Sequence, residues 1–153
     1  MARRSTTAPS YALGMAALSS AARALIEKGA LAHVSCVNPD GSPHVSCVWV
    51  GFDGDDLVFG SLGPWQKLRN LERDPRVVVS LESDVANEVG MREYLVIHGT
   101  ATVTHGGAPE LLQRLARVYA GPDVKFPPMD DPPPGSVVRI AIDKVTGVGP
   151  WLD

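Results

Sequence analysis

The sequence contains only two cysteines and no long apolar run, and both shortages narrow the classes of protein to which it can belong. No stretch approaches roughly 18 consecutive apolar residues, so we expect no membrane-spanning helix. The first ten residues, MARRSTTAPS, contain paired arginines but no apolar segment behind them, which is unlike a secretory signal peptide. These features predict a cytoplasmic protein without a membrane partner.

The two cysteines, Cys36 and Cys47, fall on the two arms of a predicted hairpin. Neither belongs to a CxxC pair or to a Cys/His spacing typical of a metal site, so the sequence predicts no bound metal. A disulfide between the two is conceivable, but a reducing cytosol favours free thiols.

A large excess of charge of one sign is also missing, because the net charge is −3 and charged residues make up 20% of the chain. A general nucleic-acid-binding protein would carry a marked basic excess, so we expect no nucleic-acid partner. Hydrophobic residues make up 44% of the 153 residues, a globular composition for one domain with one core. We expect a flexible tail at residues 1–14 and a single domain at residues 15–153.

What the sequence does contain is a series of alternating, strand-like runs with a few helical segments among them. The expected strands are 31–37, 44–52, 57–61, 76–82, 94–105 and 137–149, and the expected helices are 18–28, 64–74 and 109–119. Asp40-Gly41 is a strong hairpin signal, and a second tight turn at 53–55 extends this hairpin to a three-stranded meander. Gly99 indicates a bulge or bend. About six antiparallel strands with a few flanking helices predict an α+β protein built on a small β-barrel.

The turn sets the register of the first hairpin and therefore decides which side chains share a face. If Pro39 faces Ser42, the core face carries Val34, Cys36, Val45, Cys47 and Trp49. The opposite face then carries His33, Ser35, Val37, His44, Ser46 and Val48. This mixed face is typical of a strand beside a cleft or a subunit interface, with plain solvent exposure as the alternative.

The segment 61–70, SLGPWQKLRN, follows a strand and passes through a glycine-proline break into a short helix. The helical spacing predicts one polar side with Gln66, Lys67, Arg69 and Asn70 and one buried side with Trp65, Leu68 and Leu71. A helix N-terminus beside a lysine and the Ser61 hydroxyl suits a phosphate group. The alternative is an ordinary solvated amphipathic helix.

The order of these motifs resembles the pyridoxamine 5'-phosphate oxidase-like superfamily of split β-barrels, which is also described as the FMN-binding split barrel. The resemblance rests on SPHVSCVWV, DGDDLVF, KLRNLERDPRV and VTGVGPW, and it covers roughly residues 18–151. Within the superfamily the sequence is most similar to the actinobacterial, PPOX-class branch that uses the deazaflavin coenzyme F420.

The resemblance implies a homodimer with two cofactor clefts at the subunit interface. It implies that Lys67 binds the cofactor phosphate, that Ser61 contributes a hydroxyl group, and that Gln66 replaces a second basic residue. It further implies that the strand segment of Ser46, Val48 and Trp49 lines the ring of the cofactor. The longer tail of the deazaflavin could use Arg69 and Asn70, and Trp151 either closes over the ring or anchors the chain end on the barrel.

Two departures from the family pattern bear on the cofactor. Flavin-binding members carry an arginine and a lysine on the second strand, where this sequence has Val45 and Val50. FMN would lose charge-assisted hydrogen bonds at these positions, so the resemblance favours coenzyme F420, with FMN as the alternative. A second basic cluster for the phosphate of a pyridoxamine substrate is missing as well.

The expected activity is an oxidoreductase reaction in which the reduced deazaflavin transfers a hydride to an electron-poor double bond of a small organic acceptor. The alternatives are an FMN-binding oxidoreductase of the same fold and a non-catalytic F420-binding carrier. No catalytic residue is identified, because His33, His44 and His98 are each weak candidates for a proton donor. The proline-rich loop at residues 125–135 is either a wall of the substrate pocket or a rigid connector.

Overall fold

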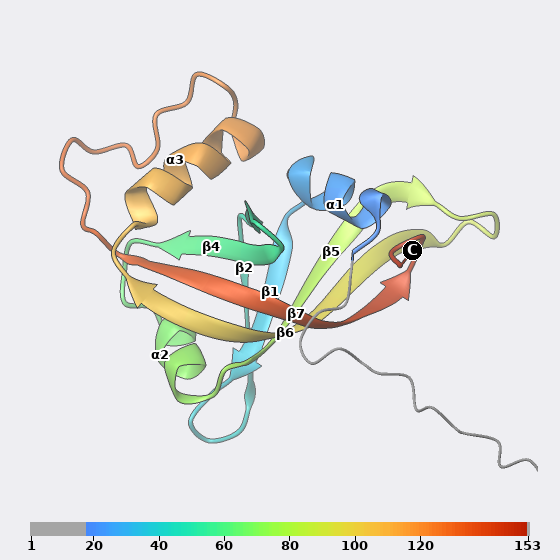
Figure 1. Cartoon of the computed structure of the whole chain (residues 1–153), viewed down its shortest axis with the longest axis horizontal. Helices are drawn as coiled ribbons and strands as arrows, with labels where there is room; N and C mark the ends of the chain where they lie inside the picture. The colour runs from blue at the N-terminus through green and yellow to red at the C-terminus, as the bar shows by residue number, and fades with distance from the viewer. Residues whose placement is uncertain (1–17, 153) are drawn as a thin grey trace, which may run out of the picture.

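Seven strands and three helices form the part of the chain that the computed structural model describes, residues 18–152 (Figure 1). The predicted tail at residues 1–14 lies outside these residues. In chain order the elements are α1 (Ser20–Glu27), β1 (Ala32–Val37), β2 (Pro43–Val48), β3 (Gly51–Asp53), β4 (Asp56–Ser61), α2 (Gln66–Arg73), β5 (Arg76–Ala86), β6 (Arg92–His105), α3 (Ala108–Tyr119) and β7 (Ser136–Val148). The predicted α+β class is confirmed, and each predicted helix is present with slightly different bounds.

The seven strands form one antiparallel sheet in the order β2-β1-β5-β6-β7-β4-β3. The two edge strands, β2 and β3, are consecutive in the chain and are separated only by Trp49 and Val50. The chain therefore crosses from one edge of the curled sheet to the other at these two residues, which is the arrangement of a split barrel (Figure 1).

The predicted continuous second strand and the simple meander are wrong at this crossing. The run 44–52 breaks at Trp49, and β4 pairs with β3 and β7. At the break, the backbone of Val50 bonds to a side chain and not to a neighbouring strand. The amide nitrogen of Val50 donates to the Tyr119 hydroxyl of α3 at 3.1 Å, and this hydroxyl donates to the Val50 carbonyl oxygen at 3.2 Å. A side chain from a distant helix thus replaces the ladder partners of Val50.

The predicted register of the first hairpin is also wrong by one residue. Val37 pairs with Pro43 and Cys36 pairs with His44, so the connecting loop is 38–42 and not a two-residue turn. Asp40 stabilises this longer loop by accepting hydrogen bonds from the Ser42 backbone at 3.0 Å and hydroxyl at 2.6 Å. A slip of one residue moves every side chain of one strand to the other face.

The consequence of this slip is confined to β2. On β1, Val34 and Cys36 are buried as predicted, but their partners across the ladder are Ser46 and His44. The side chain of Val45 is 62% exposed on the outer face. The two cysteines lie on opposite faces of the hairpin and are free thiols, one buried and one exposed, so the prediction that both lie on the core face is wrong.

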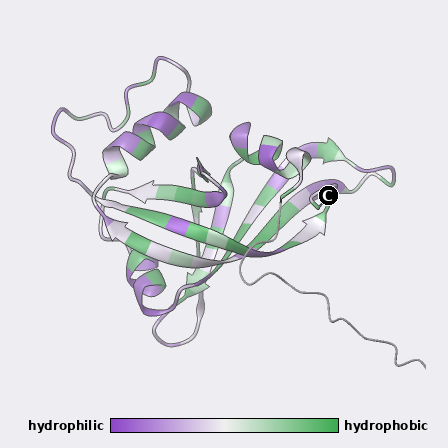
Figure 2. Cartoon of the chain, in the orientation of Figure 1, coloured by the Kyte–Doolittle hydropathy of each residue, from purple (hydrophilic) through white to green (hydrophobic). Residues whose placement is uncertain are grey.

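The inside of the barrel is filled by apolar side chains of β4, β5, β6 and β7, including Leu57, Phe59, Val79, Leu95, Ile97 and Ile140. Figure 2 shows hydrophobic stretches along the strands of the sheet. The predicted bulge at Gly99 is confirmed as a register shift between β6 and β7. A Cβ atom at Gly99 would lie 2.5 Å from a methyl group of Ile140 and 2.6 Å from the carbonyl oxygen of Ala141, so only glycine allows the two strands to approach here.

Trp151 closes the opposite end of the domain from α2. Its side chain is 5% exposed, and its indole nitrogen donates a hydrogen bond to the carbonyl oxygen of Tyr94 at 2.7 Å. The Ser19 amide, at the start of α1, donates to the Trp151 carbonyl at 3.0 Å. Of the two expected roles, the structure places this residue as an anchor of the chain end.

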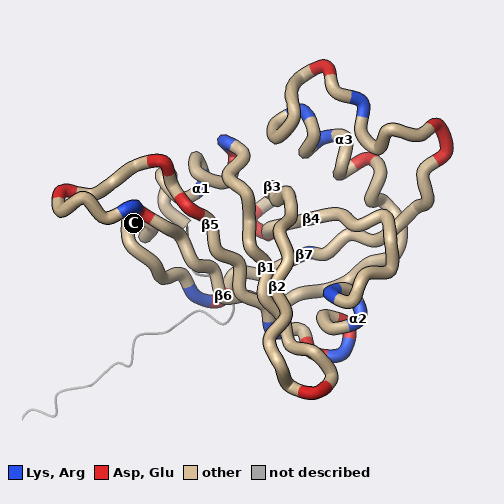
Figure 3. Tube along the Cα trace, turned by 180° about the vertical axis from the view of Figure 1, so that it is seen from behind, with Lys and Arg blue, Asp and Glu red and all other residues tan. Residues whose placement is uncertain are grey.

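Charged side chains are distributed unevenly over the barrel (Figure 3). Acidic residues gather on the hairpin between β5 and β6, whereas Lys67, Arg69 and Arg73 lie along α2. Within residues 18–152, no helix is long and apolar enough to cross a membrane, and no cluster of metal-ligating side chains is found.

Candidate functional site

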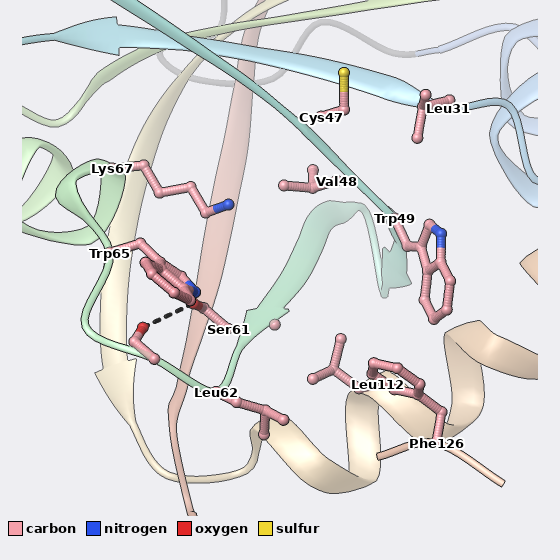
Figure 4. A pocket seen from close by; sticks show the side chains of 12 residues that line it. Leu31, Cys47, Val48, Trp49, Ser61, Leu62, Trp65, Lys67, Leu112 and Phe126 are labelled. Atoms are coloured by element: carbon pink, nitrogen blue, oxygen red, sulfur yellow. Dashed lines mark hydrogen bonds between the residues drawn. The ribbon is translucent and has the colours of Figure 1, made fainter. Parts of the chain in front are cut away.

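A cleft of about 400 Å³ opens between β2, β4, the turn before α2, and α3 (Figure 4). Its walls are mainly apolar and come from five separate segments of the chain. The residues that line it are Leu31, Cys47, Val48, Trp49, Gly60, Ser61, Leu62, Gly63, Trp65, Lys67, Leu112 and Phe126. Of the predicted site residues, the structure brings Val48, Trp49, Ser61 and Lys67 together in this cleft.

The N-terminus of α2 forms one end of the cleft. The N-cap residue, Trp65, makes no side-chain capping hydrogen bond, and the first turn of the helix contains no acidic residue. The first amide groups of a helix carry a partial positive charge when no side chain caps them. Lys67 lies in the same turn, so a full positive charge is added to the partial one.

Lys67 is half-buried and carries the only charged side chain among the residues that line the cleft. Burial lowers the pKa of its ammonium group, and the nearby thiols of Cys36 and Cys47 partly oppose this shift. The ammonium nitrogen lies 6.0 Å from the ring centre of Phe59. No carboxylate within residues 18–152 forms an ion pair with Lys67, so its charge is available to an anionic ligand.

Ser61 and Trp65 shape the floor and rim beside Lys67. The Ser61 hydroxyl donates to the carbonyl oxygen of Gly63 at 2.9 Å, as Figure 4 shows, and its oxygen keeps acceptor capacity. The Trp65 ring covers Gly63 so closely that a Cβ atom there would lie 2.9 Å from the indole. Trp65 is 63% exposed, so its predicted burial is wrong: as the N-cap it has extended backbone angles and leaves the helical periodicity.

Asn70 does not project beside Lys67, which corrects the predicted polar face of α2. Its side chain is 0% exposed and lies between α2 and the first hairpin. The amide nitrogen donates to Asn38 at 2.9 Å and to the sulfur of Cys36 at 3.5 Å, while the amide oxygen accepts from Gln66 at 2.9 Å. Asn70 therefore holds the helix against β1, because a fully buried amide is stable only with partners of this kind.

Arg69 and Gln66 lie outside the cleft as well. The Arg69 guanidinium donates to the carbonyl oxygen of Pro64 at 3.1 Å and to the side-chain oxygen of Gln66 at 2.9 Å. These bonds hold Arg69 on the exposed side of α2, whereas Gln66 is half-buried and bonds to both Arg69 and Asn70. The structure thus leaves one cation in the cleft, where the resemblance implied support from several polar side chains.

Ser46 points into the barrel from β2 and does not line the cleft directly. Its hydroxyl oxygen is buried and has no hydrogen-bond partner within residues 18–152. A buried hydroxyl without a partner costs free energy in the folded state, and a bound ligand or water would supply the missing bond. This hydroxyl lies outside the cleft lining, so Lys67 remains the charged group that the cleft offers to a ligand.

The end of the cleft away from Lys67 is aromatic. The indole of Trp49 stacks on the Tyr119 ring with centroids 5.5 Å apart and an interplanar angle of 16°. The ring of Phe126 lies 5.2 Å from Trp49 at 60°. Phe126 belongs to the proline-rich loop, so this loop contributes one aromatic side chain to the wall of the cleft.

Leu31, Leu112 and Phe126 were not predicted as individual site residues. Each is an ordinary apolar residue far from the others in sequence, and the sequence contains no signal that the barrel brings them together. None of the predicted histidines lines the cleft: His44 contacts Cys36 at 3.8 Å, and His98 contacts Thr146 at 3.5 Å.

The donor set of the cleft fits a cofactor that is mainly an apolar ring system with one singly charged group. Lys67 and the α2 N-terminus offer one charged contact, and the walls of Val48, Leu62 and Leu112 offer apolar surface. A haem iron requires an axial ligand such as histidine, and no histidine lines this cleft.

Comparison with known proteins places residues 18–149 in the family model described as pyridoxamine 5'-phosphate oxidase. No curated protein sequence matches the chain. An F420 reductase of known structure has a TM-score of 0.64 and 23% identity, covering 81% of this chain and 94% of that one.

Two further solved structures show how widely this fold is used. A FAD-binding protein from Mesorhizobium loti has a TM-score of 0.60 and 21% identity, covering 85% of this chain and 94% of that one. A heme binding protein from Mycobacterium smegmatis has a TM-score of 0.60 and 20% identity, covering 84% and 52% respectively. At these identities the likeness concerns the fold alone.

Proposed function

The chain belongs to the pyridoxamine 5'-phosphate oxidase family, and from this premise we propose that it is an oxidoreductase dependent on coenzyme F420. The observation that carries the proposal is the cleft, in which one available cation at an uncapped helix N-terminus faces an otherwise apolar interior. Such a cleft suits a planar cofactor ring with a phosphate at one end.

At the position of the phosphate group, the number of positive charges supports the deazaflavin over FMN. The phosphate of coenzyme F420 is a diester with one negative charge, whereas the monoester of FMN carries about −1.5 to −2 at neutral pH. Lys67 is the only charged side chain of the cleft, and Val45 and Val50 stand where flavin-binding members carry basic residues. A single ammonium group with helix N–H groups matches a monoanion more closely than a dianion.

The proposed reaction is the transfer of a hydride to an electron-poor double bond of a small organic acceptor. When bound, the reduced deazaflavin supplies this hydride. The chain itself contributes binding of the phosphate by Lys67 and the α2 N-terminus, orientation of the ring along Val48 and Trp49, and apolar walls that exclude water. No histidine or carboxylate lines the cleft, so we infer that solvent supplies the proton that completes the reduction.

We also propose that the protein works as a cytoplasmic homodimer with its cofactor clefts at the interface and a single domain from residue 15 to residue 153. Leu31 and Trp65 line the cleft and are 48% and 63% exposed, and a second subunit packed against the cleft would cover both side chains. Sedimentation equilibrium of the purified protein tests the dimer, and a monomer at micromolar concentration contradicts it.

Titration of the purified protein with coenzyme F420 and, in parallel, with FMN tests the proposed cofactor. We expect fluorescence to report micromolar or tighter binding of F420 and much weaker binding of FMN. Tight FMN binding would favour the alternative flavoprotein. Binding of neither would refute the oxidoreductase proposal, and F420 binding without turnover over a panel of electron-poor acceptors would favour the non-catalytic carrier.

A further inference from the structure

A second cavity, of about 290 Å³, adjoins the proposed cofactor cleft at the turn after β4. The two share Leu62 and Gly63, but the other walls of the second cavity come from α2, the end of β6 and the start of β7. Glu72, His105 and Ser136 line it. A carboxylate, an imidazole and a hydroxyl group from three separate elements thus meet in one small cavity outside the cleft.

The hydroxyl and the imidazole face each other across two strands. Ser136 is the first residue of β7 and pairs with His105, the last residue of β6. The hydroxyl oxygen of Ser136 lies 3.2 Å from Nδ1 of His105. In the neutral tautomer with its proton on Nε2, Nδ1 accepts a hydrogen bond from this hydroxyl. The imidazole is then placed to take up the serine proton, which is the role of a general base.

The carboxylate lies at the other ring nitrogen. Oε1 of Glu72 in α2 is 3.6 Å from Nε2 of His105. This distance is longer than a hydrogen bond while the ring is neutral. Once the ring has taken up a proton, the carboxylate and the imidazolium attract each other as an ion pair. Glu72 therefore stabilises the protonated imidazole that a proton transfer from Ser136 would produce.

The backbone holds Ser136 in place from both sides. At this residue β7 pairs with Ser61 of β4 and with His105 of β6. The Gly106 amide donates to the carbonyl oxygen of Gly135 at 2.7 Å. Gly135 has a φ angle of +57°, and a Cβ atom there would collide with the carbonyl oxygen of Ser61, so only glycine fits. The hydroxyl is thus fixed opposite the imidazole before any ligand binds.

The surroundings of the three side chains suit a small ester. Ser136 is 5% exposed, whereas the side chain of His105 is 82% exposed and in contact with water. Leu62, Pro64 and Leu68 line the same cavity and offer apolar surface to a short acyl chain. The volume admits a small molecule and excludes a long-chain lipid.

We propose that Glu72, His105 and Ser136 form a second active site that hydrolyses small carboxylic esters, with Ser136 as the nucleophile, His105 as the general base and Glu72 as a positioning residue. The Ser136 oxygen bonds to the carbonyl carbon of the ester, and its proton passes to Nδ1 of His105. The bond from that carbon to the alcohol oxygen breaks, and the alcohol leaves with the proton. Water then attacks the acyl group with the help of His105, which releases the carboxylic acid and restores the Ser136 hydroxyl. This site is independent of the cofactor, because none of the three residues lines the cofactor cleft.

Hydrolysis of 4-nitrophenyl acetate by the purified full-length protein tests the site, since this ester is small and its leaving group departs readily. We expect turnover that saturates with ester concentration and that falls to the rate of buffer alone in Ser136→Ala. His105→Ala should lower kcat by about a hundredfold or more, the usual contribution of a general base. Ser80→Ala and His98→Ala are the matched controls, because neither side chain lines this cavity, and both should keep the full rate.

A fluorophosphonate probe identifies the nucleophile, because a serine oxygen activated by a base displaces its fluoride and retains the phosphonyl group. Mass spectrometry of the digested protein should locate this label on Ser136. Glu72→Gln should lower kcat about two- to fivefold, the range for an exposed ion pair, with KM and the urea midpoint unchanged. A purely structural role of Glu72 would lower the urea midpoint or raise KM.

The outcomes decide the proposal without reference to the cofactor. Loss of hydrolysis in Ser136→Ala and His105→Ala, with the label on Ser136, would support the site whether or not the protein binds F420. A rate that is linear in ester concentration and equal in Ser136→Ala would overturn it, because scattered surface nucleophiles also attack activated esters. Loss in His105→Ala alone would overturn it as well, since the imidazole would then attack the ester directly. If Ser136→Ala does not fold, the position of the label decides.

Discussion

The two ends of the cleft differ in chemistry and in the way the fold produces them. The Lys67 end is built by one contiguous segment, the turn and first helical turn after β4. The aromatic end joins the strand break to α3 and the loop after it, which lie far from the strand break in sequence. A local anion site needs only backbone amides and one side chain, whereas an apolar wall has to be assembled from several elements.

The largest expected effect comes from a residue that belongs to neither end. Trp151→Ala removes a buried indole and its hydrogen bond to Tyr94, so we expect a loss of about 3–5 kcal/mol in the free energy of unfolding. Urea denaturation measures this loss. Binding of F420 to the fraction that remains folded should be unchanged, because Trp151 does not line the cleft.

A clear drop in the F420 affinity of folded Trp151→Ala would contradict this separation of folding and binding. It would support the alternative role that the resemblance implied, in which Trp151 closes over the cofactor ring. Leu152→Ala is the matched control, since the neighbouring side chain is exposed and should change neither quantity.

Removing the charge of the Lys67 end should have the next largest effect. Lys67→Ala should weaken F420 binding by about 1.5–3 kcal/mol, roughly ten- to more than a hundredfold in Kd, the range for a hydrogen bond to a charged group. Arg69→Ala is the matched control because the Arg69 guanidinium is bonded to Pro64 and Gln66 outside the cleft. Equal losses in both variants would mean that Arg69 turns toward the ligand after all.

The charge of Lys67 also predicts that the affinity for F420 depends on pH. Burial lowers the pKa of Lys67, so its ammonium deprotonates at a lower pH than that of an exposed lysine. We expect F420 affinity to be highest at low pH and to fall as the pH rises through this pKa. A bound anion favours the ammonium and raises the pKa again.

Calorimetric titrations between about pH 7 and about pH 10 measure this dependence. Lys67→Arg should bind with little change over the same range, because a guanidinium stays protonated. The urea midpoint of either protein should not follow the same pH profile. A parallel fall in the urea midpoint and the F420 affinity would indicate a general loss of structure and would contradict the assignment to Lys67.

The smallest expected effect concerns the orphaned hydroxyl of Ser46. Ser46→Ala removes a buried polar atom without a partner, so the free energy of unfolding should stay equal or rise by up to about 1 kcal/mol. F420 affinity should be unchanged, because the Ser46 side chain does not line the cleft. Ser80→Ala, on the outer face of β5, is the control. A loss of stability in Ser46→Ala would show that the hydroxyl already has a partner.

The elements of this fold follow closely from local patterns. The helix ending before Asp74-Pro75, the bulge at Gly99 and the final strand were all predicted, because turn residues and apolar periodicity act over a few neighbours. The register of β2 was not predicted. It depends on whether the loop has two or five residues, and the hydrogen bonds of Asp40 and Ser42 decide between these.

The sequence by itself determined the α+β class, the order of the strands along the chain, and the helix with Lys67 in its first turn after β4, since all of these are properties of neighbouring residues. Only the tertiary structure decided that Asn70 is buried and bonded to the first hairpin, that Trp65 is exposed, and that the rings of Trp49 and Phe126 lie in contact. The physical reason is that a side chain's surroundings depend on which distant segments the closed barrel packs against it, and residues next to it in the chain carry no record of that packing.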